Sequence, residues 1–273
     1  MNVALKYREP IADARRVVVK IGTGVLVRRN GRIEHRRVAR LVQDLAGLWR
    51  RGLDLLVVTS GAIGAGMEAL GMRRRPAGLP DLQMAAAVGQ CRLMGVYGEL
   101  FSARGCTVGQ VLLTHDDFNH RIRLTNARRT MENLLRHRVV PIINENDVVA
   151  DEEIRADIRL GDNDFLASLV VKLVRADLLI LLTTVDGLRA PADGGGTRRV
   201  EYLESVNRRT FALVAAHNGP LSVGGMASKL RAAQTAARAG CSVVIADGRQ
   251  PRILERIMRG ENVGTLVLAT LGG

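Results

Sequence analysis

The stretch Val17-Val18-Val19-Lys20-Ile21-Gly22 is a short run of mostly β-branched residues that ends in a glycine. Apolar runs of this kind, without polar alternation, are typical of strands that are buried on both faces of a parallel sheet. Four later runs repeat the pattern: Leu53–Val58, Val139–Ile143, Leu178–Leu182 and Ser242–Ile245. A sixth segment, Thr107–Leu113, is interpreted in the same way.

Helical segments alternate with these runs. Each has apolar residues at i, i+3 and i+4 spacing, which is the pattern of a helix with one buried face. The segments are Arg36–Arg50, Leu82–Ala103, Leu124–Arg136, Asp164–Arg175 and Met226–Ala239. Regular alternation of strand and helix predicts an α/β protein, and we expect a three-layer αβα sandwich with a mostly parallel central sheet.

The chain has no linker and no internal repeat. We therefore expect a single domain over residues 1–273, in which residues 1–15 form an N-terminal extension. Two segments rich in Gly, Pro or Arg, Met72–Pro80 and Arg189–Arg199, are predicted to be surface loops.

The net charge of +13 and the pI near 10.9 first suggest a nucleic-acid-binding protein. However, only four lysines stand against 36 arginines, and the arginines are scattered along the chain. One Trp, three Tyr and four Phe also offer few of the aromatic platforms on which single strands stack. We interpret the charge as a solvated basic surface and expect no specific nucleic-acid partner.

Cysteine and histidine form neither a disulfide framework nor a metal-binding pattern. The three cysteines (Cys91, Cys106 and Cys241) are widely spaced and include no Cys-x-x-Cys, which fits a reducing compartment. The first residues lack the apolar core of a signal peptide, and no run of 18 apolar residues occurs. The sequence therefore predicts a cytoplasmic protein with no membrane partner.

Polar and glycine-rich segments follow the apolar runs. Because ligands bind at the carboxyl ends of the strands in open α/β sheets, we expect the chemistry to lie in these segments. In chain order they are Lys20–Gly24, Thr59–Gly66, Asn144–Asp147, Gly161–Asp164, Thr183–Thr184 and Gly224–Lys229.

Two of the four lysines, Lys20 and Lys229, lie in glycine-rich turns, which present backbone N–H groups to anions. The acids and amides of Asn144–Asp147 and of residues 162–164 would face them, an arrangement suited to phosphoryl transfer with Mg²⁺. Plainer interpretations exist: Lys20 could extend to solvent, Lys229 could be an ordinary helix residue, and residues 162–164 could cap a helix. Neither the P-loop pattern nor the dinucleotide-binding fingerprint is present, which disfavours both of those classes.

Six motifs together resemble the glutamate 5-kinase branch of the amino-acid kinase family. They are Val19–Thr23, Val58–Ile63, Ala87–Gln90, Ile143–Asp147, Gly161–Asp164 and Gly224–Lys229. The resemblance spans residues 16–268, and its most specific parts are the Asn-Glu-Asn-Asp motif at 144–147 and the Gly-Asp-Asn-Asp motif at 161–164. It implies ATP-dependent phosphorylation of the γ-carboxylate of L-glutamate, the first step of proline synthesis. It also implies ATP as co-substrate, Mg²⁺, and a homo-oligomer, either a dimer or a tetramer.

The same resemblance implies roles for individual residues. Lys20 and Lys229 would contact the transferring phosphoryl group, Asp164 would hold both lysines in position, and Asp162 could help to place Mg²⁺. Ser60, Asp147 and Asn163 would hold glutamate. The nucleotide site would be lined by Lys20, Thr183, Thr184, Val223, Gly224, Gly225, Met226, Ala227, Ser228 and Lys229.

The sequence departs from the family pattern in three places. Thr184 stands where the family usually has Asp, so a nucleotide contact is either lost or supplied by Asp186. The segment Asp151–Leu160 is longer than the usual hairpin, and we expect no C-terminal PUA domain of the kind that many bacterial relatives carry. The alternatives are another amino-acid kinase, acting on acetylglutamate, carbamate or a phosphate acceptor, or a basic nucleic-acid-binding or regulatory protein on a kinase-like scaffold.

Overall fold

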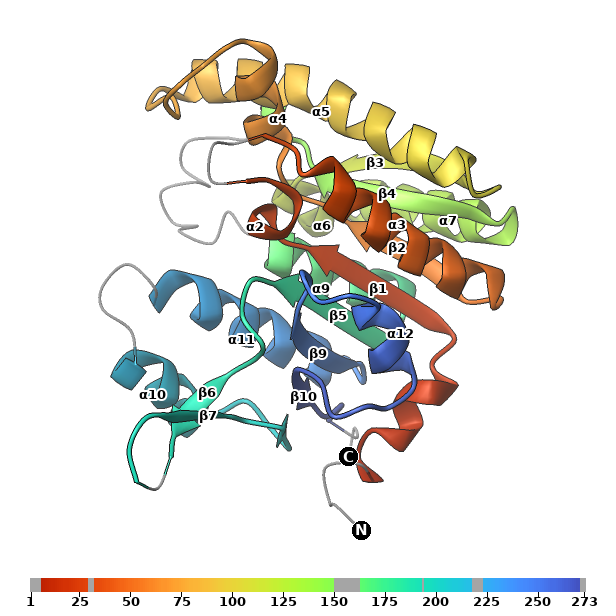
Figure 1. Cartoon of the computed structure of the whole chain (residues 1–273). Coiled ribbons are helices and arrows are strands. Elements are labelled where there is room, and N and C mark those ends of the chain that lie inside the picture. The colour runs from red at the N-terminus through yellow and green to blue at the C-terminus, as the bar shows by residue number, and fades with distance from the viewer. Residues whose placement is uncertain (1–5, 29–31, 150–162, 193, 218–222, 271–273) are drawn as a thin grey trace.

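The computed structural model describes residues 6–28, 32–149, 163–192, 194–217 and 223–270 (Figure 1). Its central feature is an eight-stranded sheet in the order β3-β4-β2-β1-β5-β9-β10-β8. The first six strands in this order are parallel, and β10 runs antiparallel to β9. The strands are β1 (Arg16–Ile21), β2 (Asp54–Val58), β3 (Thr107–Leu113), β4 (Val139–Glu145), β5 (Leu178–Thr183), β8 (Tyr202–Leu203), β9 (Ser242–Asp247) and β10 (Thr265–Val267).

Helices cover both faces of the sheet, so the predicted three-layer αβα architecture is confirmed (Figure 1). Every predicted helix is present, with its ends shifted by at most three residues. These helices are α3 (His35–Arg50), α5 (Leu79–Ser102), α7 (Arg121–Arg136), α9 (Asn163–Val174) and α11 (Val223–Arg238). The early start of α5 is explained by Pro80, because proline is tolerated in the first turn of a helix.

Alternate residues of each central strand enter two different hydrophobic cores. In β1, Val17 and Val19 pack with α3, α5 and a short helix, α12 (Ile253–Met258), while Val18 packs on the other face with α7, α9 and α11. Both faces of β1 are therefore dry, and this is why its sequence shows no polar alternation.

The prediction that Arg189–Arg199 is an irregular surface loop is wrong. This segment forms an antiparallel hairpin of β6 (Arg189–Pro191) and β7 (Thr197–Arg199). The three glycines of its turn, Gly194, Gly195 and Gly196, all have positive φ, a conformation that glycine adopts without steric cost. The hairpin was missed because its strands are short, exposed and rich in arginine, so they carry no apolar signal.

Several short elements were also not predicted. They have one to three turns, too few for a helical period to be recognised, and comprise η1 (Glu9–Asp13), α2 (Thr23–Leu26), α4 (Ala62–Ala69), α6 (His115–Asn119), η2 (Asp147–Val149) and α10 (Arg208–His217). The predicted loop at Met72–Pro80 is largely confirmed, because no helix or strand occurs between α4 and the start of α5.

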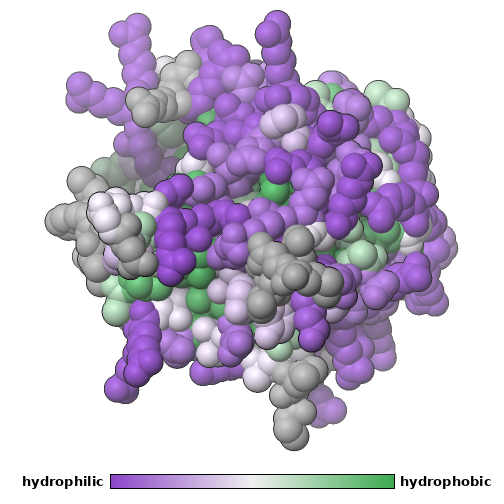
Figure 2. All heavy atoms as spheres, turned by 60° about the horizontal axis from the view of Figure 1, so that its bottom comes forward, coloured by the Kyte–Doolittle hydropathy of each residue, from purple (hydrophilic) through white to green (hydrophobic). Residues whose placement is uncertain are grey.

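None of the helices among the described residues is both long enough and apolar enough to cross a membrane. Figure 2 shows one face of the molecule, which is covered mainly by hydrophilic residues with small apolar areas between them.

Candidate active site

The carboxyl ends of four neighbouring strands, β4, β2, β1 and β5, meet at one edge of the sheet. Lys20 near the end of β1 pairs with Val58 of β2 on one side and with Leu181 of β5 on the other. Val58 pairs in turn with Ile143 of β4, the residue before Asn144. Lys20 and Asn144 therefore lie at the same edge, as the sequence predicted.

A charge cluster of Lys20, Asp164 and Lys229 occupies this edge. The Lys20 Nζ lies 2.7 Å from one carboxylate oxygen of Asp164, and the Lys229 Nζ lies 2.8 Å from the other. Asp164 is fully buried, and the two lysines are only 2% and 8% exposed. Two ammonium groups around one carboxylate leave one excess positive charge in a nearly dry place, which favours an anionic ligand.

Three different elements bring these groups together. β1 carries Lys20, Asp164 lies in the first turn of α9, and Lys229 lies in the second turn of α11. Lys229 also donates to the main-chain oxygen of Gly225, one turn earlier in the same helix, at 3.3 Å. These contacts within the protein restrict the two side chains, so both ammonium groups are held in position at the sheet edge.

A cluster of amides and hydroxyls lies beside the charge cluster, at the ends of β2 and β4. The Asn163 NH₂ group has two hydrogens to share among three acceptors: its Nδ2 lies 2.6 Å from the Thr59 main-chain oxygen, 3.0 Å from the Ser60 Oγ and 2.9 Å from the Asn144 Oδ1. The other atom of this amide, Asn163 Oδ1, is buried without a hydrogen-bond partner among the described residues. Asp147, in η2, is partly exposed close to the end of β4.

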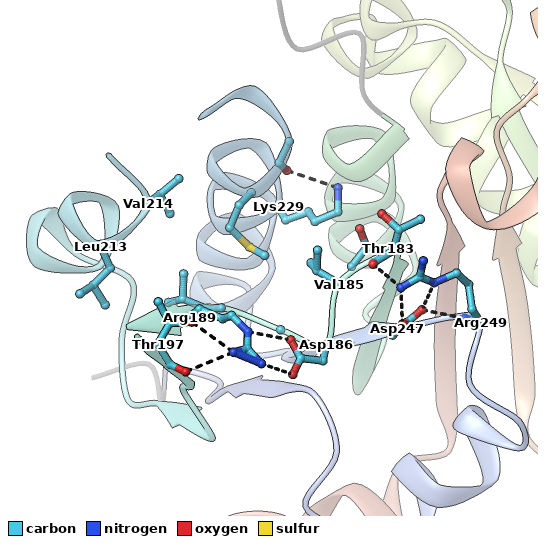
Figure 3. Close-up of a pocket in the computed structure, with 15 residues that line it drawn as sticks. Thr183, Val185, Asp186, Arg189, Thr197, Leu213, Val214, Lys229, Asp247 and Arg249 are labelled. Atoms are coloured by element: carbon cyan, nitrogen blue, oxygen red, sulfur yellow. Dashed lines mark hydrogen bonds and ion pairs between the residues drawn. The ribbon is translucent and has the colours of Figure 1, made fainter. Parts of the chain in front are cut away.

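A cavity of about 850 Å³ opens on the other side of Lys229 (Figure 3). This volume is in the range of small-molecule sites. Figure 3 shows Lys229 reaching from α11 toward Thr183 at the end of β5, with Val185 beneath it. The wall is formed by the turn after β5, the β6–β7 hairpin, α10, α11 and the end of β9; the lining residues are Thr183 to Arg189, Thr197, Leu213, Val214, Gly225, Met226, Lys229, Asp247 and Arg249.

Five of the ten residues predicted for the nucleotide site line this cavity: Thr183, Thr184, Gly225, Met226 and Lys229. Lys20 instead lies at the charge cluster, and Ala227 is half-buried outside the lining. Ser228 is buried, and its Oγ has no hydrogen-bond partner among the residues that the structure describes. Val223 and Gly224 form the first turn of α11.

Arg249 and Asp247 belong to the cavity wall but were not predicted from the sequence. The Arg249 guanidinium binds the Asp247 carboxylate through Nε at 2.9 Å and Nη2 at 2.8 Å, and it also donates to the Thr184 main-chain oxygen at 2.7 Å. Although partial burial acts to raise the pKa of Asp247, the hydrogen bonds from Arg249 hold that pKa below its usual value. The only sequence signal was the position of these residues at a strand end.

Thr184, which stands where the family usually has Asp, and Asp186 both line the cavity. Thr184 is exposed on the cavity wall, and its carbonyl is held by Arg249. Asp186 lines the cavity but is paired with Arg189 at 3.0 Å.

Asp162, predicted to help place Mg²⁺, and the segment Asp151–Leu160 both lie outside the described residues. Within the part of the chain that the structure describes, no group of three His, Cys, Asp or Glu side chains could hold a metal ion by itself. Both oxygens of Asp164 are engaged by lysines.

Comparisons with known proteins agree with this geometry. A family model described as the amino acid kinase family matches residues 15–247. A glutamate 5-kinase from Marinomonas sp. is 43% identical over 96% of this chain and 69% of its own length. A glutamate 5-kinase from Clostridium acetobutylicum is 38% identical over 98% of both chains.

Two solved structures are similar in fold. A carbamate kinase from Giardia lamblia, bound to AMP-PNP, superposes with a TM-score of 0.65 at 17% identity and covers 95% of this chain and 100% of its own. A UMP kinase from Bacillus anthracis gives a TM-score of 0.60 at 14% identity and covers 94% of this chain and 97% of its own.

Proposed function

The chain belongs to the amino acid kinase family, and we propose that it phosphorylates the γ-carboxylate of L-glutamate with ATP. The product is L-glutamyl 5-phosphate, and the reaction is the first step of proline synthesis. Relatives of 38–44% identity that align over nearly the whole chain are glutamate 5-kinases, and this supports the assignment of the acceptor.

The observation that carries the proposal is the position of the charge cluster between two different sites. Lys229 belongs both to the Lys20–Asp164–Lys229 cluster and to the wall of the 850 Å³ cavity. Asn163, next to Asp164 in the chain, belongs to the amide cluster on the opposite side. A nucleotide in the cavity and an amino acid at the amide cluster would therefore meet at the two lysines.

The chemistry requires alignment and charge neutralisation more than proton transfer. A γ-carboxylate is ionised at neutral pH, so its oxygen attacks the γ-phosphorus without a general base. The bond from phosphorus to the β–γ bridging oxygen breaks, and ADP leaves. We assign to Lys20 and Lys229 the stabilisation of negative charge on the phosphoryl oxygens, and to Asp164 the positioning of both ammonium groups.

We assign Mg²⁺ to the nucleotide, where it would neutralise phosphate charge. This fits the residues present, because Asp164 is already saturated by two lysines, and Mg²⁺ commonly binds through substrate phosphates and few protein carboxylates. Asp162 is the protein residue that we propose as an additional ligand.

For the acceptor, we propose that Ser60, Asp147 and Asn163 hold glutamate. The unpartnered Asn163 Oδ1 supports this, because a buried carbonyl oxygen without a donor costs free energy that an ammonium group of a ligand would recover. The Asp147 carboxylate would complement the same ammonium group.

We also propose that the enzyme is a homo-oligomer. Helix α5 lies at the outer edge of the molecule (Figure 1), and its outward side carries Met84, Ala87, Val88 and Cys91 at helical spacing. An exposed apolar helix face of this kind is typical of an interface, here with a second copy of the chain. Sedimentation equilibrium of the wild type should give a mass of at least twice 29.6 kDa.

An assay of ADP release tests the acceptor, using glutamate, acetylglutamate, aspartate and carbamate, with hydroxylamine to trap an acyl phosphate as its hydroxamate. We expect turnover with glutamate alone, since acetylation removes the ammonium group that Asn163 and Asp147 would bind. Preference for acetylglutamate or carbamate, or ADP release that does not depend on any acceptor, would overturn the proposal.

A further inference from the structure

Four polar side chains form a continuous hydrogen-bonded chain beneath the acceptor site. The Asn163 Nδ2 donates to the Asn144 Oδ1 at 2.9 Å, and the Asn144 Nδ2 donates to the Gln90 Oε1 at 2.8 Å. Ser60 joins at the other end, where its Oγ accepts from Asn163 at 3.0 Å. Gln90 lies in α5, so this chain connects a helix to the ends of β2 and β4.

The direction of every bond in this chain is fixed by one main-chain atom. The Thr59 carbonyl oxygen can only accept, so the atom of Asn163 that lies 2.6 Å from it must be the NH₂ group. Asn144 must then accept from Asn163 through its side-chain oxygen and donate to Gln90 through its NH₂ group. Gln90 must accept this hydrogen bond through its own side-chain oxygen. No amide in the chain can be reversed alone without placing two donors or two acceptors face to face.

This arrangement leaves two buried polar atoms without a hydrogen-bond partner among the described residues, one an acceptor and the other a donor. Asn163 keeps a buried acceptor, Oδ1, and Gln90 keeps a buried donor, Nε2; neither has a hydrogen-bond partner among the described residues. Gln90 also borders a small space of about 20 Å³, together with Glu145, Asp147 and Val148. An unpaired acceptor and an unpaired donor in one network are complementary to an ammonium group and a carboxylate on one ligand.

We propose that Gln90 is a further specificity residue, which donates a hydrogen bond from Nε2 to the α-carboxylate of the amino-acid acceptor. This inference rests on the proposed function and extends it to a residue whose motif, Ala87–Gln90, has no assigned role. The α-ammonium group would bind Asn163 Oδ1 and Asp147, and Gln90 would recognise the group that distinguishes an α-amino acid from a simple amine.

The order of the strands indicates which of the two carboxylates of glutamate would bind Gln90. Lys20 lies in β1 and Lys229 reaches toward the end of β5 (Figure 3), whereas Gln90 contacts Asn144 at the end of β4, two strands away from β1. Neighbouring strands lie about 4.8 Å apart, so this separation is about 10 Å. The reacting carboxylate must meet the lysines, and the carboxylate at the Gln90 end is therefore the other one.

Gln90 could instead act only by orienting Asn144, or by orienting Asp147 across the small space that they share. These roles predict different responses to ligands that lack one group each. Glutarate has no ammonium group, and 4-aminobutyrate has no α-carboxylate, while both retain the carboxylate that would be phosphorylated in glutamate.

The test compares wild type, Gln90→Met and Gln90→Glu, using the KM for glutamate and ATP and the inhibition constants of glutarate and 4-aminobutyrate. Gln90→Met removes the donor, whereas Gln90→Glu keeps an acceptor for Asn144 but presents a carboxylate in place of the NH₂ group. In both variants we expect the glutamate KM and the glutarate constant to rise about 10- to 100-fold. In Gln90→Glu, which keeps the acceptor for Asn144, the constants for 4-aminobutyrate and ATP should stay within about twofold. Gln90→Met also removes that acceptor, so for this variant we expect only the ATP constant to stay within about twofold.

Equal losses for all three acceptor-site ligands in Gln90→Glu would overturn the proposal in favour of a role in orienting Asn144. A loss confined to glutamate and 4-aminobutyrate would overturn it in favour of a role in orienting Asp147. Tyr97→Phe is the matched control, because it removes a buried hydroxyl that lies 2.9 Å from the Thr59 Oγ1 but faces no ligand; it should lower the melting temperature without changing the ratio of glutarate to 4-aminobutyrate affinity. If wild type does not phosphorylate glutamate, the proposed function fails by itself, and the same pattern is then measured by calorimetric binding of the three ligands.

Discussion

At the scale of single residues, the charge cluster depends on lysine specifically. Lys229 fits between the Asp164 carboxylate and the Gly225 carbonyl, with 2.8 and 3.3 Å contacts to its compact ammonium group. Arginine is longer and planar, and cannot occupy this space while keeping both contacts. We expect Lys229→Ala to lower kcat by about 10²- to 10³-fold with little change in the glutamate KM, and Lys229→Arg to be nearly as poor.

Lys172→Arg is the matched control for this prediction, because Lys172 is exposed on α9 and stands outside the site. It should leave the steady-state rates unchanged, as expected in a chain that uses arginine at 36 of its 40 basic positions. A Lys229→Arg enzyme with near-normal kcat would show that the ammonium group does not touch the transferring phosphoryl group.

Asp44 gives a pH-dependent prediction away from the active site. It lies on α3 facing α12, and burial together with the Glu255 charge raises its pKa to about 6, although Arg252, Arg40 and the main chain at Leu254 oppose the shift. Because the folded pKa is the higher one, folding favours the protonated acid, and this stabilisation is lost as the pH rises through 6.

Asp44→Asn should therefore increase the free energy of unfolding at pH 8 by about 1 kcal/mol, after allowance for solvent screening, and by much less at pH 4.5. Denaturant unfolding of both proteins at the two pH values measures the difference. The same gain at both pH values would mean that the ionised carboxylate carries no cost.

At this scale, the sequence could predict which residues meet but not the network that orients them. Lys20, Asp164 and Lys229 could be grouped because each follows a strand or opens a helix at one sheet edge. Arg249 and the unpaired donor of Gln90 could not, because their roles depend on contacts with residues 65 and 54 positions away in the chain.

At the scale of elements, helices α4 and α5 cross with their backbones in direct contact. A Cβ atom added to Gly66 would lie 1.7 Å from the Ala85 carbonyl oxygen, and one added to Gly89 would lie 1.7 Å from that of Ala62. α4 begins directly after the Ser60–Gly61 turn, and α5 carries Gln90, so this crossing fixes the distance between two parts of the proposed acceptor site.

Gly89→Ala should lower the free energy of unfolding by about 1–3 kcal/mol or more and raise the glutamate KM, because the helices must separate to admit the methyl group. Gly95→Ala in the same helix is the control, since nothing lies within 4 Å of an added Cβ. It should stabilise the protein by about 0.5–1 kcal/mol through helix propensity, as chemical denaturation can measure. Equal effects of the two substitutions would contradict the close crossing.

Helices and strands were predicted correctly where a buried face gives the sequence a regular spacing of apolar residues, and they were missed where no such spacing exists. The six long strands and five long helices were predicted because each has at least one buried face. The β6–β7 hairpin is exposed, and β10 has only three residues, so neither has enough buried apolar positions to be predicted from the sequence.

At the scale of the whole molecule, the arginines that give the net charge of +13 are scattered along the chain. Several arginines are neutralised locally by a carboxylate close in sequence, as Arg123 is by Asp116 at 3.1 Å and Arg189 is by Asp186 at 3.0 Å. We expect the remaining charge to produce a diffuse field, which attracts polyanions without selecting among their sequences.

We therefore expect weak binding to duplex DNA at 50 mM salt and its loss by about 200 mM, with the steep linear dependence of log affinity on log salt that counterion release produces. Fluorescence anisotropy with two duplexes of unrelated sequence should give the same affinity at each salt concentration. Saturating ATP should not displace the DNA beyond the effect of its ionic strength, because a cavity of about 850 Å³ has the size of a small-molecule site and does not admit a duplex. Sequence-selective binding at 150 mM salt, or competition between DNA and ATP at constant ionic strength, would instead indicate a nucleic-acid site that overlaps the proposed nucleotide site.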